Sequence, residues 1–112
     1  MLKIETAFGE VRINRKTYYS DMLVFWDGKK EFIPKFSVLD TALLAKALEK
    51  KPGDIVLFAG ENGSVRIREE VLDILEEKGI DIFIEKNSKA AKIFNAFMAA
   101  GKKAAAIVHC GP

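Results

Sequence analysis

The chain has 112 residues, a length typical of one compact domain, and 49% of them are hydrophobic, which suffices for a core without disulfides or a structural metal. Eighteen Lys and Arg against sixteen Asp and Glu give a formal net charge of +2, with the two signs interspersed along the chain. This balance excludes a strongly basic surface, so we expect neither nucleic acid nor an anionic membrane as a partner.

The pattern of residues 1–36 predicts an antiparallel β-meander. Apolar and polar residues alternate over residues 10–14, and a turn and a second short strand follow. Residues 22–26 are continuously apolar, and Asp27-Gly28 is a strong signal for a tight hairpin turn. The aromatic side chains here are most simply part of the core: Phe25, Trp26 and Phe32.

In residues 37–53 the apolar residues recur with the period of a helix. Four of them share one helical face: Leu43, Leu44, Ala47 and Leu48. Either Ser37 or Asp40 is placed to cap a helix of about three turns, which ends before Pro52-Gly53. Residues 54–59 are then apolar on both faces, which is typical of a buried parallel strand.

Residues 54–112 predict a βαβαβ unit. Residues 69–79 and 87–101 have helical apolar spacing and end in glycine, whereas residues 80–84 and 104–108 have the composition of strands. Either Asn87 or Ser88 is placed to cap the second helix. This alternation predicts three parallel strands covered by helices, with the meander extending the sheet or lying on it. The chain is thus expected to be a single α/β domain.

Length and cysteine content point to a simple cytoplasmic protein. The apolar runs are far shorter than the roughly 20 residues that span a bilayer, and the first residues open no signal-peptide pattern. The single cysteine, Cys110, excludes an internal disulfide, and one Cys with one His cannot build a structural zinc site, so we expect no metal and no cofactor. Fourteen Lys and ten Glu with no Gln resemble the composition of proteins from hot environments.

Any ligand site is expected at the carboxyl ends of the parallel strands, where loops and helix amino termini converge. Segments 60–64, 85–88 and 109–112 share this loop edge. The candidate ligand-binding residues on or near it are Gly60, Asn62, Gly63, Ser88, Asn95 and His109. The glycine loop lacks the lysine of a Walker loop and the three-glycine dinucleotide pattern. An alternative is therefore that these glycines end a strand and form a turn, and that Asn95 bonds to backbone.

His109 and Cys110 are adjacent, which suggests a thiol activated by an imidazole. Neighbouring residues on a strand point to opposite faces, however, so we expect His109 to be a polar residue that faces a ligand or the core. Asp21 is either a general base near the loop edge or a turn carboxylate. The sequence predicts no catalytic set and leaves the role of Cys110 open.

Several short motifs, by their order and spacing, resemble those of a known family. The motifs are Phe8-Gly9, Val11, Ile13, Tyr18, Asp21, Asp27-Gly28, Ala59-Gly60 with Gly63, Gly79-Ile80, Phe94-Asn95, Gly101 and residues 104–109. The family consists of small single-domain proteins of unknown function and includes the third mitochondrial respiratory complex I assembly factor and the adipogenesis-associated single-domain protein. The resemblance covers nearly the whole chain and implies a three-layer α/β fold with a central mixed sheet. It implies little chemistry, because the mitochondrial member is a non-enzymatic assembly factor that acts through protein contacts.

Two functions are consistent with these patterns. The first is a non-enzymatic protein-binding or assembly-type module, which contacts a protein partner or a second copy through exposed aromatic residues; the candidates are Trp26, Phe32 and Phe36. The alternative is a small anionic-ligand binder or an enzyme at the loop edge, with His109 as the titrating group. A ligand site requires a concave pocket on the order of several hundred Å³ lined by His109, whereas a protein-binding module requires a flat apolar surface elsewhere.

Overall fold

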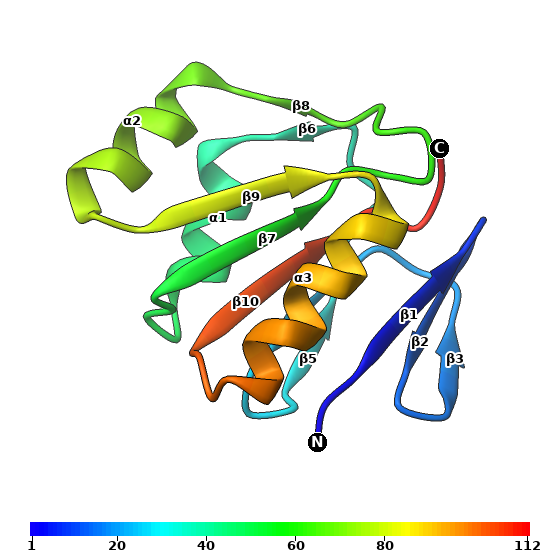
Figure 1. Cartoon of the computed structure of the whole chain (residues 1–112). Coiled ribbons are helices and arrows are strands. Elements are labelled where there is room, and N and C mark those ends of the chain that lie inside the picture. The colour runs from blue at the N-terminus through cyan, green and yellow to red at the C-terminus, as the bar shows by residue number, and fades with distance from the viewer.

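A mixed five-stranded sheet forms the centre of the protein, whose computed structural model describes all 112 residues (Figure 1). The strand order is β5–β4–β10–β7–β9. The strands are Met22–Phe25 (β4), Lys30–Phe32 (β5), Asp54–Phe58 (β7), Asp81–Glu85 (β9) and Ala104–Val108 (β10). β10, β7 and β9 run parallel, while β4 pairs antiparallel with both β10 and β5. The predicted parallel unit and the mixed sheet are therefore both confirmed.

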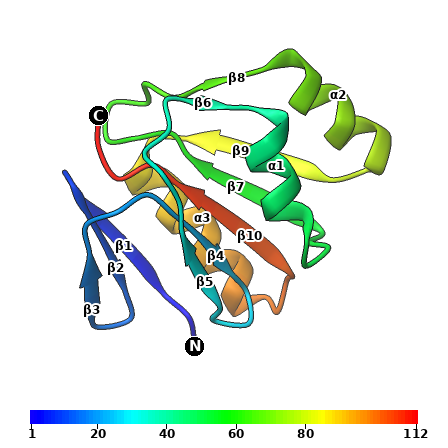
Figure 2. The same ribbon diagram turned by 180° about the vertical axis from the view of Figure 1, so that it is seen from behind.

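Two further layers cover the faces of this sheet. The helices α1 (Thr41–Leu48) and α2 (Glu69–Lys78) lie on one face (Figure 2). The helix α3 (Asn87–Ala99) lies on the other face. Beside α3 packs a small antiparallel sheet made of β1 (Ile4–Ala7), β2 (Glu10–Ile13) and β3 (Lys16–Tyr18). The three-layer α/β architecture is thus confirmed.

Each face of the central sheet has its own hydrophobic core. Successive residues of a strand point to opposite faces, so neighbouring residues of β7 enter different cores. Leu57 packs with Leu75 of α2 in the first core, whereas Phe58 packs with Phe94 of α3 and Ile4 of β1 in the second. All five side chains are buried, and each contributes about 1.5–3 kcal/mol. A shift of one residue would exchange the two cores, so the packing fixes the strand register at the loop edge.

The first 36 residues divide between two sheets. β1, β2 and β3 form the predicted antiparallel meander on the α3 side, whereas the β4–β5 hairpin extends the central sheet. The Asp27-Gly28 turn closes this hairpin, and the N–H of Phe25 donates to the carbonyl of Lys29 at 2.8 Å. The sequence left open whether the meander extends the central sheet or lies on it. In the structure β4 and β5 extend the sheet, and β1, β2 and β3 lie on it.

The helix α1 is shorter than predicted, with eight residues and about two turns. Of the two predicted caps, Asp40 is the one used, since its Oδ1 accepts from the N–H of Leu43 at 2.9 Å. The preceding residues instead form a short strand, β6 (Val38–Leu39), which pairs in parallel with β8 (Arg66–Ile67). The apolar pattern did not reveal this two-residue pairing, because it has no length in which a period can show.

The cap predicted for α3 is wrong. Asn87 is the first residue of the helix, Ser88 follows in the first turn, and Lys86 occupies the cap position with no side-chain cap bond. The side chain of Asn87 instead has a tertiary role at the loop edge. None of the three helices has the length and apolar character needed to cross a membrane.

Candidate functional site at the loop edge

The three segments predicted to share the loop edge do meet there. The N–H of Ala59 donates to the carbonyl of Glu85 at 2.9 Å, and the N–H of His109 donates to the carbonyl of Phe58 at 3.0 Å. The loop after β7 also holds the last residues of the chain, since the N–H of Glu61 donates to the carbonyl of Gly111 at 2.7 Å. Figure 1 shows the C-terminus beside this green loop.

Asn87 links all three segments through one fully buried side chain. Its Oδ1 accepts from the N–H of Gly60 at 2.9 Å, and its Nδ2 donates to the carbonyl of His109 at 2.8 Å. Its own N–H donates to the carbonyl of Gly60 at 3.1 Å. Because both ends of the amide have protein partners, Asn87 serves as a structural tie.

The glycine loop is closed by bonds within the protein. Gly60 has a φ of +99°, and a Cβ added to it would lie 2.5 Å from the backbone of Pro112. Its N–H is held by Asn87, and the N–H of Gly63 donates to the carbonyl of Gly60 at 3.1 Å. The two N–H groups that an anion cradle would use are therefore already occupied. The geometry is that of a strand end followed by a turn.

On the other side of the edge, His109 forms a buried pair with Asp21. The two residues are 4% and 5% exposed, and His109 Nδ1 lies 2.9 Å from Asp21 Oδ2. The carboxylate also accepts from the N–H of Phe36 at 3.0 Å and from the N–H of Cys110 at 2.8 Å. An ionised carboxylate only accepts hydrogen bonds, so Nδ1 carries a proton. This leaves Nε2 of His109 with no hydrogen-bond partner in the protein.

His109 lines an open hollow with a volume of about 400 Å³, which we name the His109 hollow. Its other lining residues are Lys35, Phe36, Ser37, Ser64 and Pro112. The Phe36 ring packs edge-on to the imidazole, with 5.6 Å between centroids. The ammonium of Lys35 and the two serine hydroxyls are suited to contact an anion. Nε2 accepts a hydrogen bond when the imidazole is neutral and donates one when it is protonated.

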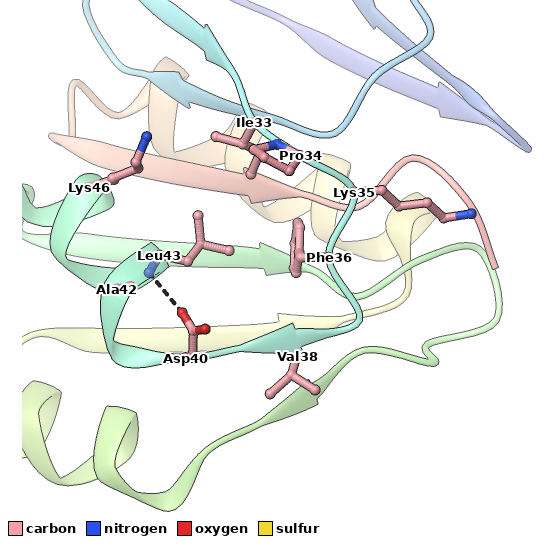
Figure 3. A pocket seen from close by; sticks show the side chains of 9 residues that line it. All are labelled: Ile33, Pro34, Lys35, Phe36, Val38, Asp40, Ala42, Leu43 and Lys46. Carbon is pink, nitrogen blue, oxygen red and sulfur yellow. Dashed lines mark hydrogen bonds between the residues drawn. The ribbon is translucent and has the colours of Figure 1, made fainter.

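A second hollow, of about 250 Å³, adjoins the first and is mainly apolar (Figure 3). We name it the apolar hollow. Its apolar lining comes from the segment after β5 and from the start of α1: Ile33, Pro34, Phe36, Val38, Ala42 and Leu43. Lys35, Asp40 and Lys46 stand around it. Lys35 and Phe36 line both hollows, so these two residues form the border between them.

The remaining candidate residues lie elsewhere. Asn62 and Gly63 line a separate hollow of about 250 Å³ near the end of β9, and Ser88 is exposed on α3. Asn95 binds the backbone of Ile4 through both ends of its amide, at 2.8 Å each, so it ties β1 to α3 as the backbone-bonding alternative expected.

Cys110 does not form a nucleophilic pair with His109. Its side chain packs against the second core, whereas the His109 ring packs on Phe36 of the first. Burial raises the pKa of the Cys110 thiol above its ordinary value, and the negative charge of Asp21 raises it further. The thiol is thus protonated near neutral pH, the opposite of an activated nucleophile. No group of three or more His, Cys, Asp or Glu side chains is arranged to hold a metal ion.

The aromatic contact candidates do not form one surface. Trp26 and Phe36 are partly buried against the first core. Phe32 is 57% exposed on β5, an edge strand of the central sheet, and its ring lies 5.6 Å from that of Tyr18. Tyr19, next to Tyr18, is 74% exposed.

Sequence reasoning missed the pairing of Asp21 with His109, and it missed Lys35, Ser37 and Ser64 as residues of the His109 hollow. Asp21 was considered singly, but only the β4–β10 pairing, which places Met22 opposite Val108, brings it to His109. Lys35, Ser37 and Ser64 lie in loops with no periodic pattern. A weak signal was present in Asp21 itself, a carboxylate directly before a fully buried strand, since such a group must have partners.

Comparisons with known proteins agree with this fold. A family model described as "Protein of unknown function (DUF498/DUF598)" matches residues 4–109. The solved structure of MT938 is 24% identical, with a TM-score of 0.79 and 100% of each chain covered. A conserved hypothetical protein from Pyrococcus horikoshii is 22% identical, with a TM-score of 0.82, and the match covers 98% of this chain and 99% of that one.

A third solved structure, an Mth938-like domain from Bordetella pertussis, is 13% identical, with a TM-score of 0.71 and coverage of 98% of this chain and 87% of that one. These structural likenesses show a shared fold. The family model, which spans almost all of the chain, confirms the resemblance indicated by the short motifs. The chain belongs to the DUF498/DUF598 family of proteins of unknown function.

Proposed function

We propose that this domain binds a small anion in the His109 hollow. The observation that carries the proposal is the state of His109: its side chain is 5% exposed, Nδ1 is held by Asp21, and Nε2 has no protein partner although the residue lines a hollow. Because Nε2 has no protein partner and His109 lines the hollow, this nitrogen is available for a hydrogen bond with a ligand or a water there.

The charges around the hollow favour an anion over a cation. Lys35 is exposed and forms no ion pair, so its ammonium is available to a ligand. Asp21 does not line the hollow, and its carboxylate oxygens are already engaged by three hydrogen-bond donors. The lining offers no activated nucleophile, and this supports binding in preference to catalysis.

The test uses the fact that His109 is the single histidine of the chain. Its ring ¹H and ¹⁵N resonances therefore report on the site without ambiguity. The protein is titrated with sodium acetate and, separately, with inorganic phosphate at constant pH and ionic strength, with sodium chloride as the reference. We expect a saturable shift of the Nε2 and Hε1 signals. A shift that grows linearly, as with chloride, would overturn the proposal.

A charge variant makes the test specific to the site. Lys35→Met removes the ammonium from the hollow, and we expect it to weaken anion binding about tenfold, the value of one charge-assisted hydrogen bond. Lys92→Met removes an equally exposed lysine from α3, on the other face of the sheet, and should leave binding unchanged. Equal losses in both variants would indicate nonspecific attraction to a basic surface.

Protein binding is the second candidate function, supported by the exposed ring of Phe32 on the edge strand β5, which lies beside the partly buried ring of Tyr18. The ammonium groups of Lys16 and Lys30 lie 5.6 Å and 5.7 Å from the centroid of the Tyr18 ring. Aromatic rings bordered by positive charges suit an acidic protein surface. Such contact would match the assembly role that the family resemblance implies.

This candidate is tested on the protein purified from its own cells by native mass spectrometry. A stoichiometric acidic partner, lost in Phe32→Ser and kept in Leu72→Ser, would support it. Leu72 is a matched control, because it is an exposed apolar residue on α2, on the opposite face of the sheet. A bare monomer, or a homodimer of this basic chain, would contradict an acidic partner.

A further inference from the structure

We propose that the ligand of the His109 hollow is an organic monocarboxylate whose apolar chain or ring lies in the adjoining apolar hollow. The inference rests on the proposed anion site and adds the chemical class of the ligand. It follows from the two residues that line both hollows, from the volumes of the hollows and from the charges around the second one.

Phe36 and Lys35 lie at the border of the two hollows. In Figure 3 the ring of Phe36 stands beside Leu43, while the side chain of Lys35 extends away from them toward the pale red C-terminal segment. The same two residues line the His109 hollow, where Phe36 packs on the imidazole. A ligand with its carboxylate at Lys35 and His109 would therefore continue over Phe36 onto an apolar surface.

The volumes favour one ligand that occupies both hollows. The His109 hollow, at about 400 Å³, is within the roughly 300–1,000 Å³ of small-molecule sites. The apolar hollow, at about 250 Å³, falls below this range, and most of its lining residues are apolar. It is suited to the tail of a molecule that is anchored next door.

The charged groups around the apolar hollow select against a second carboxylate. Lys46 is already paired with Glu31, with 3.1 Å between Nζ and Oε2. Asp40 lies in the wall, and its carboxylate is fixed as the cap of α1. A dicarboxylate would place its second charge near Asp40, and this like-charge contact weakens binding.

The experiment compares acetate, butyrate, hexanoate and the dicarboxylate adipate by the His109 resonances. Each methylene that leaves water strengthens binding about fourfold. The apolar hollow is open to solvent, so burial is partial, and we expect hexanoate to bind at least about tenfold tighter than acetate. Adipate, of the same length, should bind more weakly than hexanoate.

Two variants of α1 assign the gain to the apolar hollow. Ala42→Phe places a ring in this hollow and should abolish the advantage of hexanoate while acetate still binds. Ala45→Phe is the matched control, because Ala45 is also an exposed alanine of α1 but does not line the hollow. It should keep the advantage of hexanoate.

The outcomes separate this inference from the proposal on which it rests. Equal affinities for acetate and hexanoate would overturn the inference and leave the anion site standing. Adipate binding as tightly as hexanoate would also overturn it, in favour of a ligand that bridges Lys35 and Lys46. If none of the carboxylates and no phosphate shifts the His109 signals, both the inference and the anion site fail.

Discussion

The two sides of the loop edge each contain a buried polar side chain, but they differ in how far that side chain is satisfied. On the side between β7 and α3, the amide of Asn87 has protein partners at both ends. On the side between β10 and β4, the imidazole of His109 has a partner only at Nδ1. The amide of the first side is fully bonded within the protein, whereas the imidazole of the second side has one nitrogen without a protein partner.

Asp21→Ala would produce the largest effect, because it removes the acceptor of three buried or partly buried donors: the N–H of Phe36, the N–H of Cys110 and Nδ1 of His109. We expect a loss of about 3–5 kcal/mol of unfolding free energy, typical of breaking a buried polar pair. Urea denaturation measures this loss, and anion binding should disappear with it. Asp73→Ala, at an exposed position of α2, should change stability by less than about 0.5 kcal/mol.

If Asp21→Ala were as stable as the wild type, the Asp21–His109 pair would not hold its side of the loop edge together. If Asp21→Ala does not fold, Asp21→Asn gives the same information in milder form. Its amide keeps one acceptor oxygen, so part of the stability remains, while the tautomer of His109 is no longer imposed. The ¹⁵N shifts of the His109 ring would then change toward a mixture of the two tautomers, whereas a ring that kept the wild-type pattern would show that Asp21 does not set the tautomer.

Asn87→Ala tests the other side of the edge. It leaves the N–H of Gly60 and the carbonyl of His109 without partners in a buried setting. We expect a loss of about 2–3 kcal/mol in urea denaturation. Anion binding by the folded protein should stay within about threefold of the wild type, since the Lys35 side of the hollow is untouched. A large loss of binding with little loss of stability would mean that the two sides do not have separate roles.

Gly60→Ala should have a moderate effect. The residue has a φ of +99°, and a Cβ would approach the Pro112 backbone to 2.5 Å, so both conformation and space oppose a side chain. Gly79→Ala is the control, because Gly79 also has a positive φ, of +69°, but nothing lies within 4 Å of an added Cβ. We expect a loss of about 2–3 kcal/mol for Gly60→Ala and about 1 kcal/mol for Gly79→Ala, measured by thermal or urea unfolding. Equal losses would mean that the C-terminal segment moves aside freely.

Local patterns predicted most of the elements of this fold. The hairpin at Asp27-Gly28, α2 with its Gly79 end, and the all-apolar strand β10 follow from short-range rules that tertiary contacts reinforce here. The convergence of the three segments at the loop edge followed from the parallel alternation alone. The sequence also allowed one conditional statement, namely that a ligand site at this edge requires a concave pocket lined by His109.

The contacts that give the edge its properties could not be predicted. Asn87 had the composition signal of a helix cap, but its amide is more stabilising as a buried tie between Gly60 and His109 than as a solvated cap. Asp21 and His109 are 88 residues apart. They meet only because β4 lies beside β10. The spacing of apolar residues along the sequence does not determine which strands are neighbours in the sheet.

Cys110→Ser should have the smallest effect, one visible only as a pH dependence. In the folded protein, burial raises the pKa of the thiol, Asp21 and Glu10 raise it further, and Lys35 partly offsets them. The folded state therefore holds the thiol proton to higher pH than the unfolded state, whose thiol has a pKa of about 8.5. The resulting stabilisation is complete below that value and is lost as pH rises through the folded-state pKa. Urea denaturation from about pH 7 to about pH 10 should show the wild type losing more stability than Cys110→Ser, because the lysines and tyrosines that also titrate are common to both. Parallel profiles would show that the thiol is ionised equally easily in both states, which would contradict the burial of Cys110 against the second core on the side of the edge away from the His109 ring.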